Sequence, residues 1–166
     1  VASRFPKEGK QALASWRPHI IYLEGGNTFW LHHCMNLGDW DYYIRKACSG
    51  RNAPSIYCGT SAGAIVAGAK VETATWKGWD DPSIIPGMED ADDWKGVDGM
   101  GLVGKTSFFP HLSDEWEAIA NEKKDAMGNS SVVCLRDMDV CCVEGRTQKY
   151  SVFKGDSEAE LDVERS

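Results

Sequence analysis

The sequence lacks the patterns that send a chain into or across a membrane. It contains no apolar run of about 18 residues and no signal-peptide pattern. Positive charge is also scarce, because 18 lysines and arginines stand against 25 aspartates and glutamates, a formal net charge of −7. Such a charge argues against nucleic acid or an anionic membrane surface as a partner. We therefore expect a cytoplasmic protein with neither kind of partner.

Signatures of metal and cofactor sites are missing as well. The cysteines form no Cys-x-x-Cys pair, and the Gly-x-Gly-x-x-Gly and P-loop patterns are absent. Several cysteines fall in apolar runs, where a free thiol acts as a small hydrophobic side chain. This usage indicates a reducing, cytosolic environment, and we expect neither a metal nor a cofactor. The cysteines are Cys34, Cys48, Cys58, Cys134, Cys141 and Cys142.

What is present fits a single globular domain. A chain of 166 residues with 42% hydrophobic residues can bury one core. We expect one α/β domain over residues 1–155 and a polar tail over residues 156–166. The chain opens with Val1 and reaches a helix-like stretch over residues 6–17, so we expect part of the natural N-terminus to be missing.

A serine at a sharp turn is the most informative local pattern. Residues 53–58 are typical of a buried strand, and the small apolar residues 62–69 are typical of a helix packed on a sheet. Between them, Gly59 and Gly63 flank Ser61 in the pattern Gly-x-Ser-x-Gly, which is typical of a nucleophile elbow. That turn presents the hydroxyl at the end of a strand and the N-terminus of a helix. A plain tight turn is the alternative.

A second glycine-containing turn follows an earlier strand. Residues 19–24 are predicted to form this strand, which leads directly into Gly25 and Gly26. Two glycines allow a tight turn whose amide groups face outward. Asn27 or Thr28 is then suited to cap the following helix.

The order of these elements predicts the fold and brings the two turns together. With a further helix over residues 39–49, helices alternate with strands, which favours a mostly parallel sheet with helices on both faces. Active sites in such sheets gather at the carboxyl ends of the strands. An amide of Gly25 or Gly26 and the amide of Ala62 can then form an oxyanion hole.

The glycine pair and the acidic residues 87–99 each allow a second interpretation. The glycine pair can be a plain turn, or a loop that holds phosphate, although the phosphate-binding patterns are absent. The acidic residues 87–99 are interpreted as a solvated loop. A calcium site is the alternative there, but the EF-hand spacing is missing.

Among the four histidines, His111 has the position expected of a catalytic base. It ends a predicted short strand, whereas His19 begins a strand and His32 and His33 lie on a helix. A structural role for His111 is the alternative. The remaining sequence predicts a helix over residues 113–127 and strands over residues 131–135, 140–143 and 150–153.

These blocks together resemble the dipeptidase E and cyanophycinase family of serine peptidases. The resemblance covers most of residues 10–155 and rests on residues 21–29, on Gly-Thr-Ser-Ala-Gly-Ala at 59–64, on Asp-Asp-Pro at 80–82, on Gly101-Leu102 and on Pro110-His111. It implies a flavodoxin-like or class I glutamine-amidotransferase-like α/β fold. It also implies metal-free cleavage of peptide or isopeptide bonds next to aspartate.

The resemblance implies a role for each candidate site residue. Ser61 is expected to be the nucleophile and His111 the base. The third triad member, matched residue for residue, is Asp80, with Asp81 as the fallback; chain order does not decide a triad. The implied oxyanion and substrate-binding groups are Gly25, Gly26, Asn27 and Ala62.

Two features depart from the family pattern. Family members have two or more strands before the Gly-Gly-Asn-Thr strand, whereas only about 18 residues precede it here. If those strands are lost, a sheet edge and an apolar face are exposed, so a homodimer or a second chain is expected to cover them. Dipeptidase E also has an arginine-bearing segment after the histidine. Here no arginine follows His111 until Arg136, which leaves strict aspartate specificity open.

The sequence therefore predicts a serine-type peptidase that acts on a small peptide through an acyl-enzyme. One alternative is an esterase of the α/β-hydrolase kind, in which the histidine usually lies near the chain end. His111 follows Ser61 by only 50 residues, which favours the peptidase. The other alternative is a catalytically inactive binding domain of the same fold.

Overall fold

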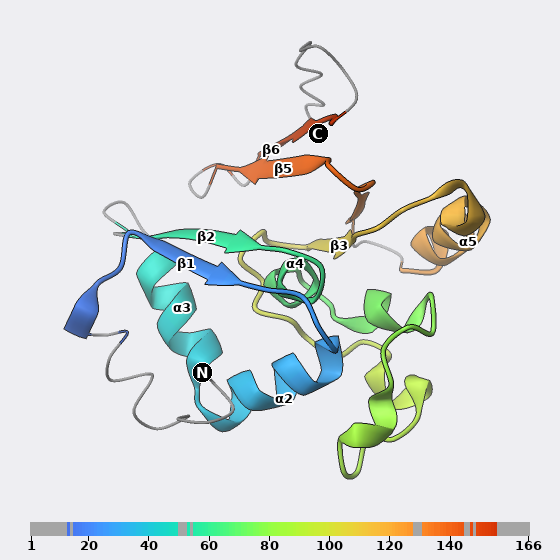
Figure 1. The fold of residues 1–166 in the computed structure, drawn as a ribbon, viewed down its shortest axis with the longest axis horizontal. Coiled ribbons are helices and arrows are strands. Elements are labelled where there is room, and N and C mark those ends of the chain that lie inside the picture. Colours follow the sequence, from blue (N-terminus) through green and yellow to red (C-terminus); the bar gives the residue numbers. More distant parts are fainter. Residues whose placement is uncertain are drawn as a thin grey trace.

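Two pairs of parallel strands and one hairpin form the framework of the fold (Figure 1). The strands are short, and within the described part of the chain they form three separate two-stranded sheets. This confirms a mixed α/β chain with parallel strands, but hydrogen bonds do not join the pairs into the single sheet that was predicted. The parallel pairs are β1 (Ile20–Leu23) with β2 (Ile56–Gly59) and β3 (Thr106–Phe109) with β4 (Ser131–Cys134); β5 (Val140–Val143) and β6 (Tyr150–Phe153) are antiparallel.

The computed structural model describes residues 13, 15–49, 53, 55–127, 131–144, 147 and 149–155. The predicted polar tail over residues 156–166 and most of the predicted helix over residues 6–17 lie outside the described residues. The strands predicted in the last third of the chain are confirmed as β4, β5 and β6.

The helices before β3 gather on one face of the β1–β2 pair (Figure 1), whereas the last helix packs against β4. Alternation explains this arrangement, because Ile21 and Leu23 face the main core while Ile20 is 63% exposed on the opposite face. In the described residues, helices therefore cover one face of this pair and not both. Among the described residues, the helices with defined bounds are α2 (Thr28–Leu37), α3 (Trp40–Cys48), α4 (Ala62–Ala67) and α5 (Glu117–Ala126).

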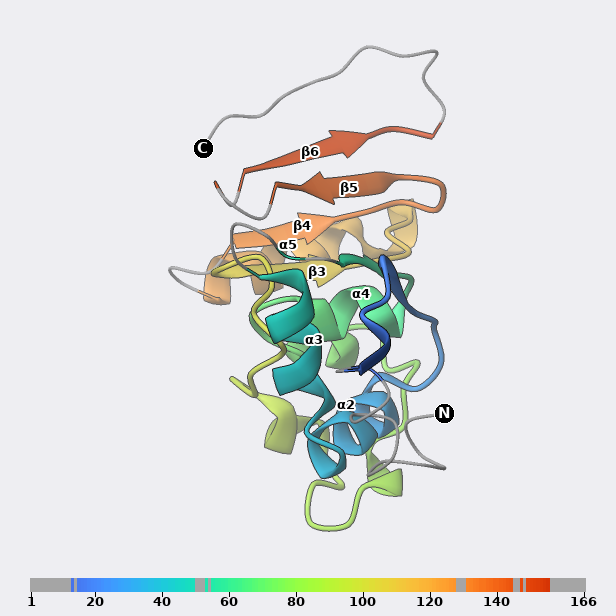
Figure 2. The same cartoon turned by 90° about the vertical axis from the view of Figure 1, so that its left-hand side faces the viewer.

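The second half of the framework starts from β3, whose four residues are all buried. The β5–β6 hairpin packs against the β3–β4 pair through an apolar cluster that includes Phe108, Val133 and Val152. Figure 2 shows β3, β4, β5 and β6 in succession.

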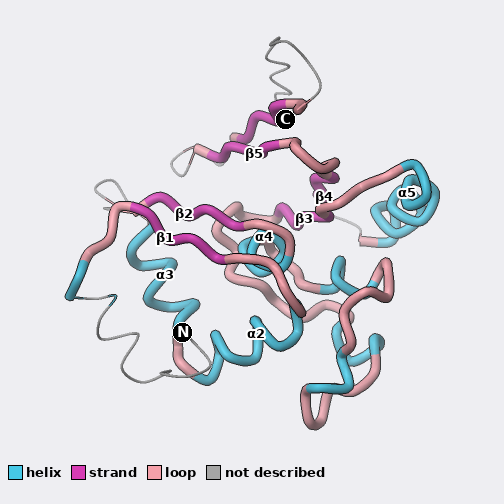
Figure 3. Tube along the Cα trace, viewed as in Figure 1, coloured by secondary structure: helices cyan, strands magenta, loops and turns pink. Residues whose placement is uncertain are grey.

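A long stretch of loops connects α4 to β3 (Figure 3). It contains the 3₁₀ turns η1 (Glu72–Thr75), η2 (Pro82–Ile84) and η3 (Ala91–Trp94) and no strand longer than an isolated bridge. The arrows of β1, β2 and β3 point the same way in Figure 1, so the segments after these strands lie on the same side of the molecule.

Candidate active site

The turn after β2 has a strained backbone at Ser61. The residue has φ of 53° and ψ of −115°, a region that residues other than glycine rarely adopt. A Cβ atom at Gly59 would lie 2.5 Å from the Gly63 carbonyl oxygen, and one at Gly63 would lie 2.1 Å from the Leu23 carbonyl oxygen. Both positions flanking the serine therefore require glycine, because backbone from β1 and α4 passes directly against them.

Hydrogen bonds hold this turn against both strands. The Thr60 amide donates to the Leu23 carbonyl over 3.0 Å, and the Tyr57 hydroxyl donates to the Gly63 carbonyl over 2.6 Å. Burial raises the pKa of Tyr57, so its hydroxyl keeps its proton for this bond. The carbonyl of Ser61 accepts from the amides of Ala64 and Ile65 in α4 over 2.9 and 3.0 Å. The serine thus has little backbone freedom.

The Gly25–Gly26 turn lies directly against Ser61. A Cβ atom at Gly25 would lie 3.1 Å from Ser61 Cβ and 3.5 Å from Ser61 Oγ. Gly26 has φ of 128°, which favours glycine. Ala62 is buried as the first residue of α4, where a backbone amide has no acceptor within the helix. The structure therefore brings the predicted oxyanion groups to one place.

Asn27 makes contacts that are structural. Its Oδ1 accepts from the Trp30 amide over 2.9 Å, so it caps α2, and its Nδ2 donates to the Asp81 carbonyl over 3.0 Å. The predicted capping role is confirmed. The same side chain ties the glycine turn to the loop before η2.

His111 follows β3 and hydrogen-bonds to an aspartate that the sequence did not single out. The distance between its Nδ1 and Asp137 Oδ1 is 2.6 Å. His111 has φ of 56°, and its side chain is 35% exposed, whereas that of Asp137 is 80% exposed. Asp137 comes three residues after Cys134, the residue opposite Phe109 in the β3–β4 register.

The structure gives Asp80 and Asp81 other partners. Asp80 Oδ2 accepts from the Thr28 amide over 2.9 Å at the start of α2. Asp81 Oδ1 accepts from the Ser83 amide over 2.9 Å, and hydrogen bonds from Ser83 lower the pKa of Asp81. In the part of the chain that the structure describes, neither carboxylate hydrogen-bonds to His111, which bonds to Asp137 instead.

Ser61 and His111 occupy the same side of the framework, after β2 and β3, but no hydrogen bond joins them among the described residues. Asp137 could have been found from the sequence only by assuming that the strand over residues 131–135 pairs in parallel with the one before His111. An aspartate just beyond its end would then lie next to the histidine.

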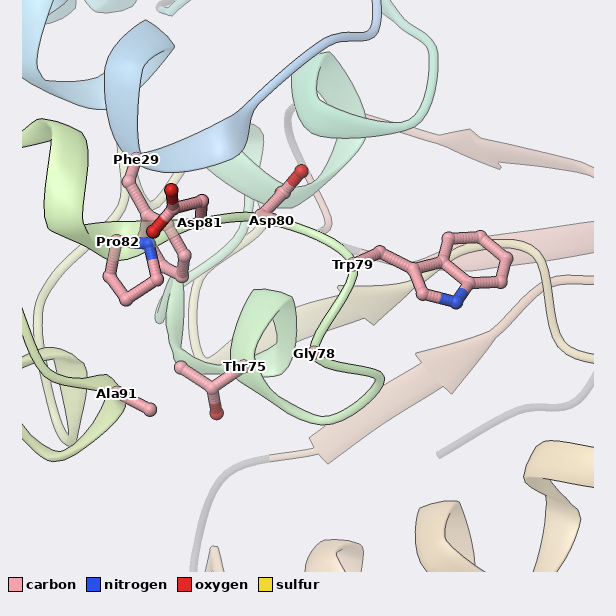
Figure 4. Close-up of a pocket in the computed structure, with 8 residues that line it drawn as sticks. All are labelled: Phe29, Thr75, Gly78, Trp79, Asp80, Asp81, Pro82 and Ala91. Atoms are coloured by element: carbon pink, nitrogen blue, oxygen red, sulfur yellow. The ribbon is translucent and has the colours of Figure 1, made fainter.

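A cavity of about 330 Å³ lies next to residues 78–82, and Trp79 is one of its lining residues. In Figure 4 the ring of Trp79 points away from the other labelled side chains, and its centroid is 6.0 Å from that of His111. Trp79 is 61% exposed, while Trp76 is buried against Phe109. The cavity is lined by Phe29, Thr75, Gly78, Trp79, Asp80, Asp81, Pro82 and Ala91.

The region beyond His111 is acidic, and Arg136 forms ion pairs within it. Arg136 donates to Asp114 Oδ1 over 2.8 Å and to Glu117 Oε1 over 2.6 Å. The structure thus brings the first arginine after the histidine back to the segment that precedes α5. Two carboxylates already neutralise it there.

The described residues contain neither a metal-binding cluster nor a membrane-spanning helix. No three His, Cys, Asp or Glu side chains there are arranged to hold a metal ion. None of the helices found there has the length and apolar character needed to cross a membrane.

Comparisons with known proteins agree with the fold. The model of peptidase family S51 matches residues 7–150. A crystal structure from Listeria monocytogenes EGD-e, provisionally assigned as a peptidase E protein, matches with a TM-score of 0.58 and 18% identity, covering 96% of this chain and 66% of the other. No curated protein matched the sequence. The match to the family model extends over most of the sequence, and the chain therefore belongs to peptidase family S51.

Proposed function

We propose that this chain hydrolyses a peptide bond through an acyl-enzyme, with Ser61 as the nucleophile and His111 as the general base. Asp137 is the carboxylate that orients His111. The observation that carries the proposal is the 2.6 Å contact between His111 Nδ1 and Asp137 Oδ1. Asp137 takes this role in preference to Asp80, because the Asp80 carboxylate accepts the Thr28 amide.

The chemistry follows from the hydrogen bond. When Nδ1 carries the proton shared with Asp137, the lone pair of Nε2 is free to accept the Ser61 hydroxyl proton. Ser61 Oγ then bonds to the carbonyl carbon, the leaving amine takes the proton from Nε2, and water hydrolyses the ester. Amides of the Gly25–Gly26 turn and of Ala62 receive the oxyanion, each contributing about 3–4 kcal/mol to the barrier reduction.

The substrate proposed is a small peptide with a peptide or isopeptide bond next to aspartate. A serine-type mechanism requires Ser61 and His111 to meet when substrate binds. Such contacts are often loose without substrate and tighten in the complex. The lack of a hydrogen bond between these two residues in the described structure favours one second candidate, a catalytically inactive binding domain.

Replacing Ser61 with alanine tests the proposal. Ser61→Ala is expected to lose at least about 1,000-fold in kcat/KM on aspartyl dipeptides and to escape labelling by a serine-directed phosphonate. Ser49→Ala is the matched control, because Ser49 is exposed at the end of α3, outside the turn. Circular dichroism establishes that both variants are folded.

Three outcomes separate the candidates. Unchanged turnover in folded Ser61→Ala overturns the serine mechanism. Turnover of short-chain nitrophenyl esters but not of dipeptides favours the esterase. A wild-type protein that neither turns over substrate nor reacts with the phosphonate is the inactive binding domain.

A further inference from the structure

A lysine ammonium lies behind the candidate base. Lys77 belongs to the loop after η1, and its Nζ donates a hydrogen bond to the carbonyl of Pro110, the residue before His111. The same nitrogen lies 4.3 Å from the centroid of the Trp79 ring and 4.4 Å from that of Phe109. The ammonium is therefore held between two aromatic faces and a backbone carbonyl.

The hydrogen bond from Lys77 to Pro110 supports the strained backbone at His111, just after β3. The Pro110 carbonyl belongs to the peptide that enters His111, whose φ is 56°. A non-glycine residue stays in that conformation only where its surroundings enforce it. Pro110 is buried, so its carbonyl needs a partner, and Lys77 supplies one.

The aromatic contacts extend the effect to the imidazole ring. Trp79 lies 6.0 Å from His111 and, edge to face, 6.0 Å from Trp116. Lys77 thus links Pro110, the residue before His111, to the tryptophan beside His111. Removing the ammonium therefore frees both the Pro110 carbonyl and Trp79, which lies beside the imidazole ring.

Lys77 interacts electrostatically with charged groups of the candidate site. Burial lowers the pKa of Lys77, while the negative charges of Asp137 and Asp80 oppose that shift. The ammonium and the carboxylate that bonds to His111 therefore attract each other. An uncharged replacement would leave Asp137 without this balance.

We propose that Lys77 is a positioning residue that holds His111 in the orientation in which its Nδ1 meets Asp137. The proposal rests on the proposed function of His111 as the base. Lys77 does not touch the reacting atoms; it acts through the Pro110 carbonyl and through Trp79. The alternative is that Lys77 stabilises the fold without affecting the orientation of His111.

Lys77→Met, Lys77→Gln and Lys77→Arg test the proposal, with Lys95→Met as the matched control. Lys95 is an exposed lysine whose ammonium pairs with Asp92 away from His111. We expect Lys77→Met to lower kcat by about 10- to 100-fold with KM within about threefold, since small displacements of catalytic groups have effects of this size. Lys77→Gln keeps a donor for Pro110 but no charge, and Lys77→Arg keeps both and should recover most of kcat.

A second readout does not depend on turnover. Nitrogen-15 NMR of labelled histidines at alkaline pH reports which ring nitrogen carries the proton, and His111→Gln identifies the His111 signals. We expect the Nδ1–H tautomer in the wild type and in Lys95→Met, and a mixture of tautomers in Lys77→Met. If wild-type protein turns over no substrate, the proposed function fails, and the tautomer alone decides the role of Lys77.

Unchanged kcat in Lys77→Met overturns the proposal, as does a loss of kcat without any change in the His111 signals. If Lys77→Met does not fold, the Gln and Arg variants give the answer in the same way. An equal loss in Lys95→Met and Lys77→Met would make the effect one of general stability and would also overturn it.

Discussion

The two halves of the candidate site are built in different ways. The serine half is a continuous stretch, in which the neighbours Ala62 and Val66 are 1% and 0% exposed and backbone leaves no space beside two glycines. The histidine half joins residues from separate segments, and the side chains of His111 and Asp137 are 35% and 80% exposed. The first half is rigid because backbone packs tightly against the turn, whereas the second depends on a few contacts between partly exposed side chains.

This difference separates stability from function. A change at Gly59 or Gly63 in the serine half must disturb the core, because the same atoms form the turn and the packing of α4 on β1. A change in the histidine half can remove chemistry and leave the fold intact, because an exposed carboxylate contributes little to folding. Each prediction below tests one side of this contrast.

The largest effect on stability is expected from Gly63→Ala. The new methyl would lie 2.1 Å from the Leu23 carbonyl oxygen, a backbone atom that cannot move without displacing β1. We expect the free energy of unfolding, measured in urea, to fall by about 4 kcal/mol or more. Gly96→Ala is the control: Gly96 has φ of 70° but nothing within 4 Å of a new Cβ, so only backbone strain of about 1–2 kcal/mol is expected. Equal losses would show that packing does not fix the elbow.

Asp137→Asn is expected to show the opposite behaviour. It should lower kcat by at least about 100-fold, since the imidazole loses its orienting carboxylate, and should change the unfolding free energy little. Asp80→Asn should lower stability by about 1 kcal/mol through the weakened cap on Thr28 and change kcat less than tenfold. Steady-state kinetics and urea unfolding on both variants show which aspartate supports catalysis and which supports stability. A larger loss of kcat in Asp80→Asn would restore Asp80 as the triad aspartate.

The same contrast explains what the sequence could predict. The strand before Ser61, the helix after it and the cap at Asn27 were predictable, because each depends on residues within one short stretch. Asp137 was not, because it lies 26 residues after His111 and reaches it only through the parallel register of β3 and β4. Asp80 matched the family spacing, yet the structure directs its carboxylate to the Thr28 amide.

The separation of the strands into three pairs could not be predicted from the sequence either. Patterning predicts that a segment is a strand, but hydrogen-bonded neighbours depend on how the loops between α4 and β3 are placed. The exposed apolar face of β1 and β2 was not predicted either. The sequence favoured helices on both faces, whereas Ile20 and Ile56 are 63% and 68% exposed.

Asp139 anchors the turn that carries Asp137, and its replacement is expected to lower stability less than Gly63→Ala does. Its side chain is 4% exposed and accepts hydrogen bonds from the Arg136 amide over 2.9 Å, from Lys154 Nζ over 3.0 Å and from the Gly155 amide over 3.4 Å. Burial by itself raises the pKa of Asp139, but these donors together outweigh it and hold the pKa below its ordinary value.

The sign of the pH dependence follows from that lowered pKa. The folded state favours the carboxylate, so the stabilisation is present above the unfolded-state pKa of about 3.9 and is lost as pH falls through the folded-state value. Asp139→Asn should cost about 2 kcal/mol at pH 7 and flatten the acid-side fall in stability, as measured by urea unfolding at several pH values. Asp92→Asn is the control, because Asp92 also has a lowered pKa, from Lys95, but its side chain is 80% exposed. If both variants follow the wild-type pH profile, the turn beneath Asp137 is not held by charge, and the histidine half owes its geometry to the Lys77 side alone.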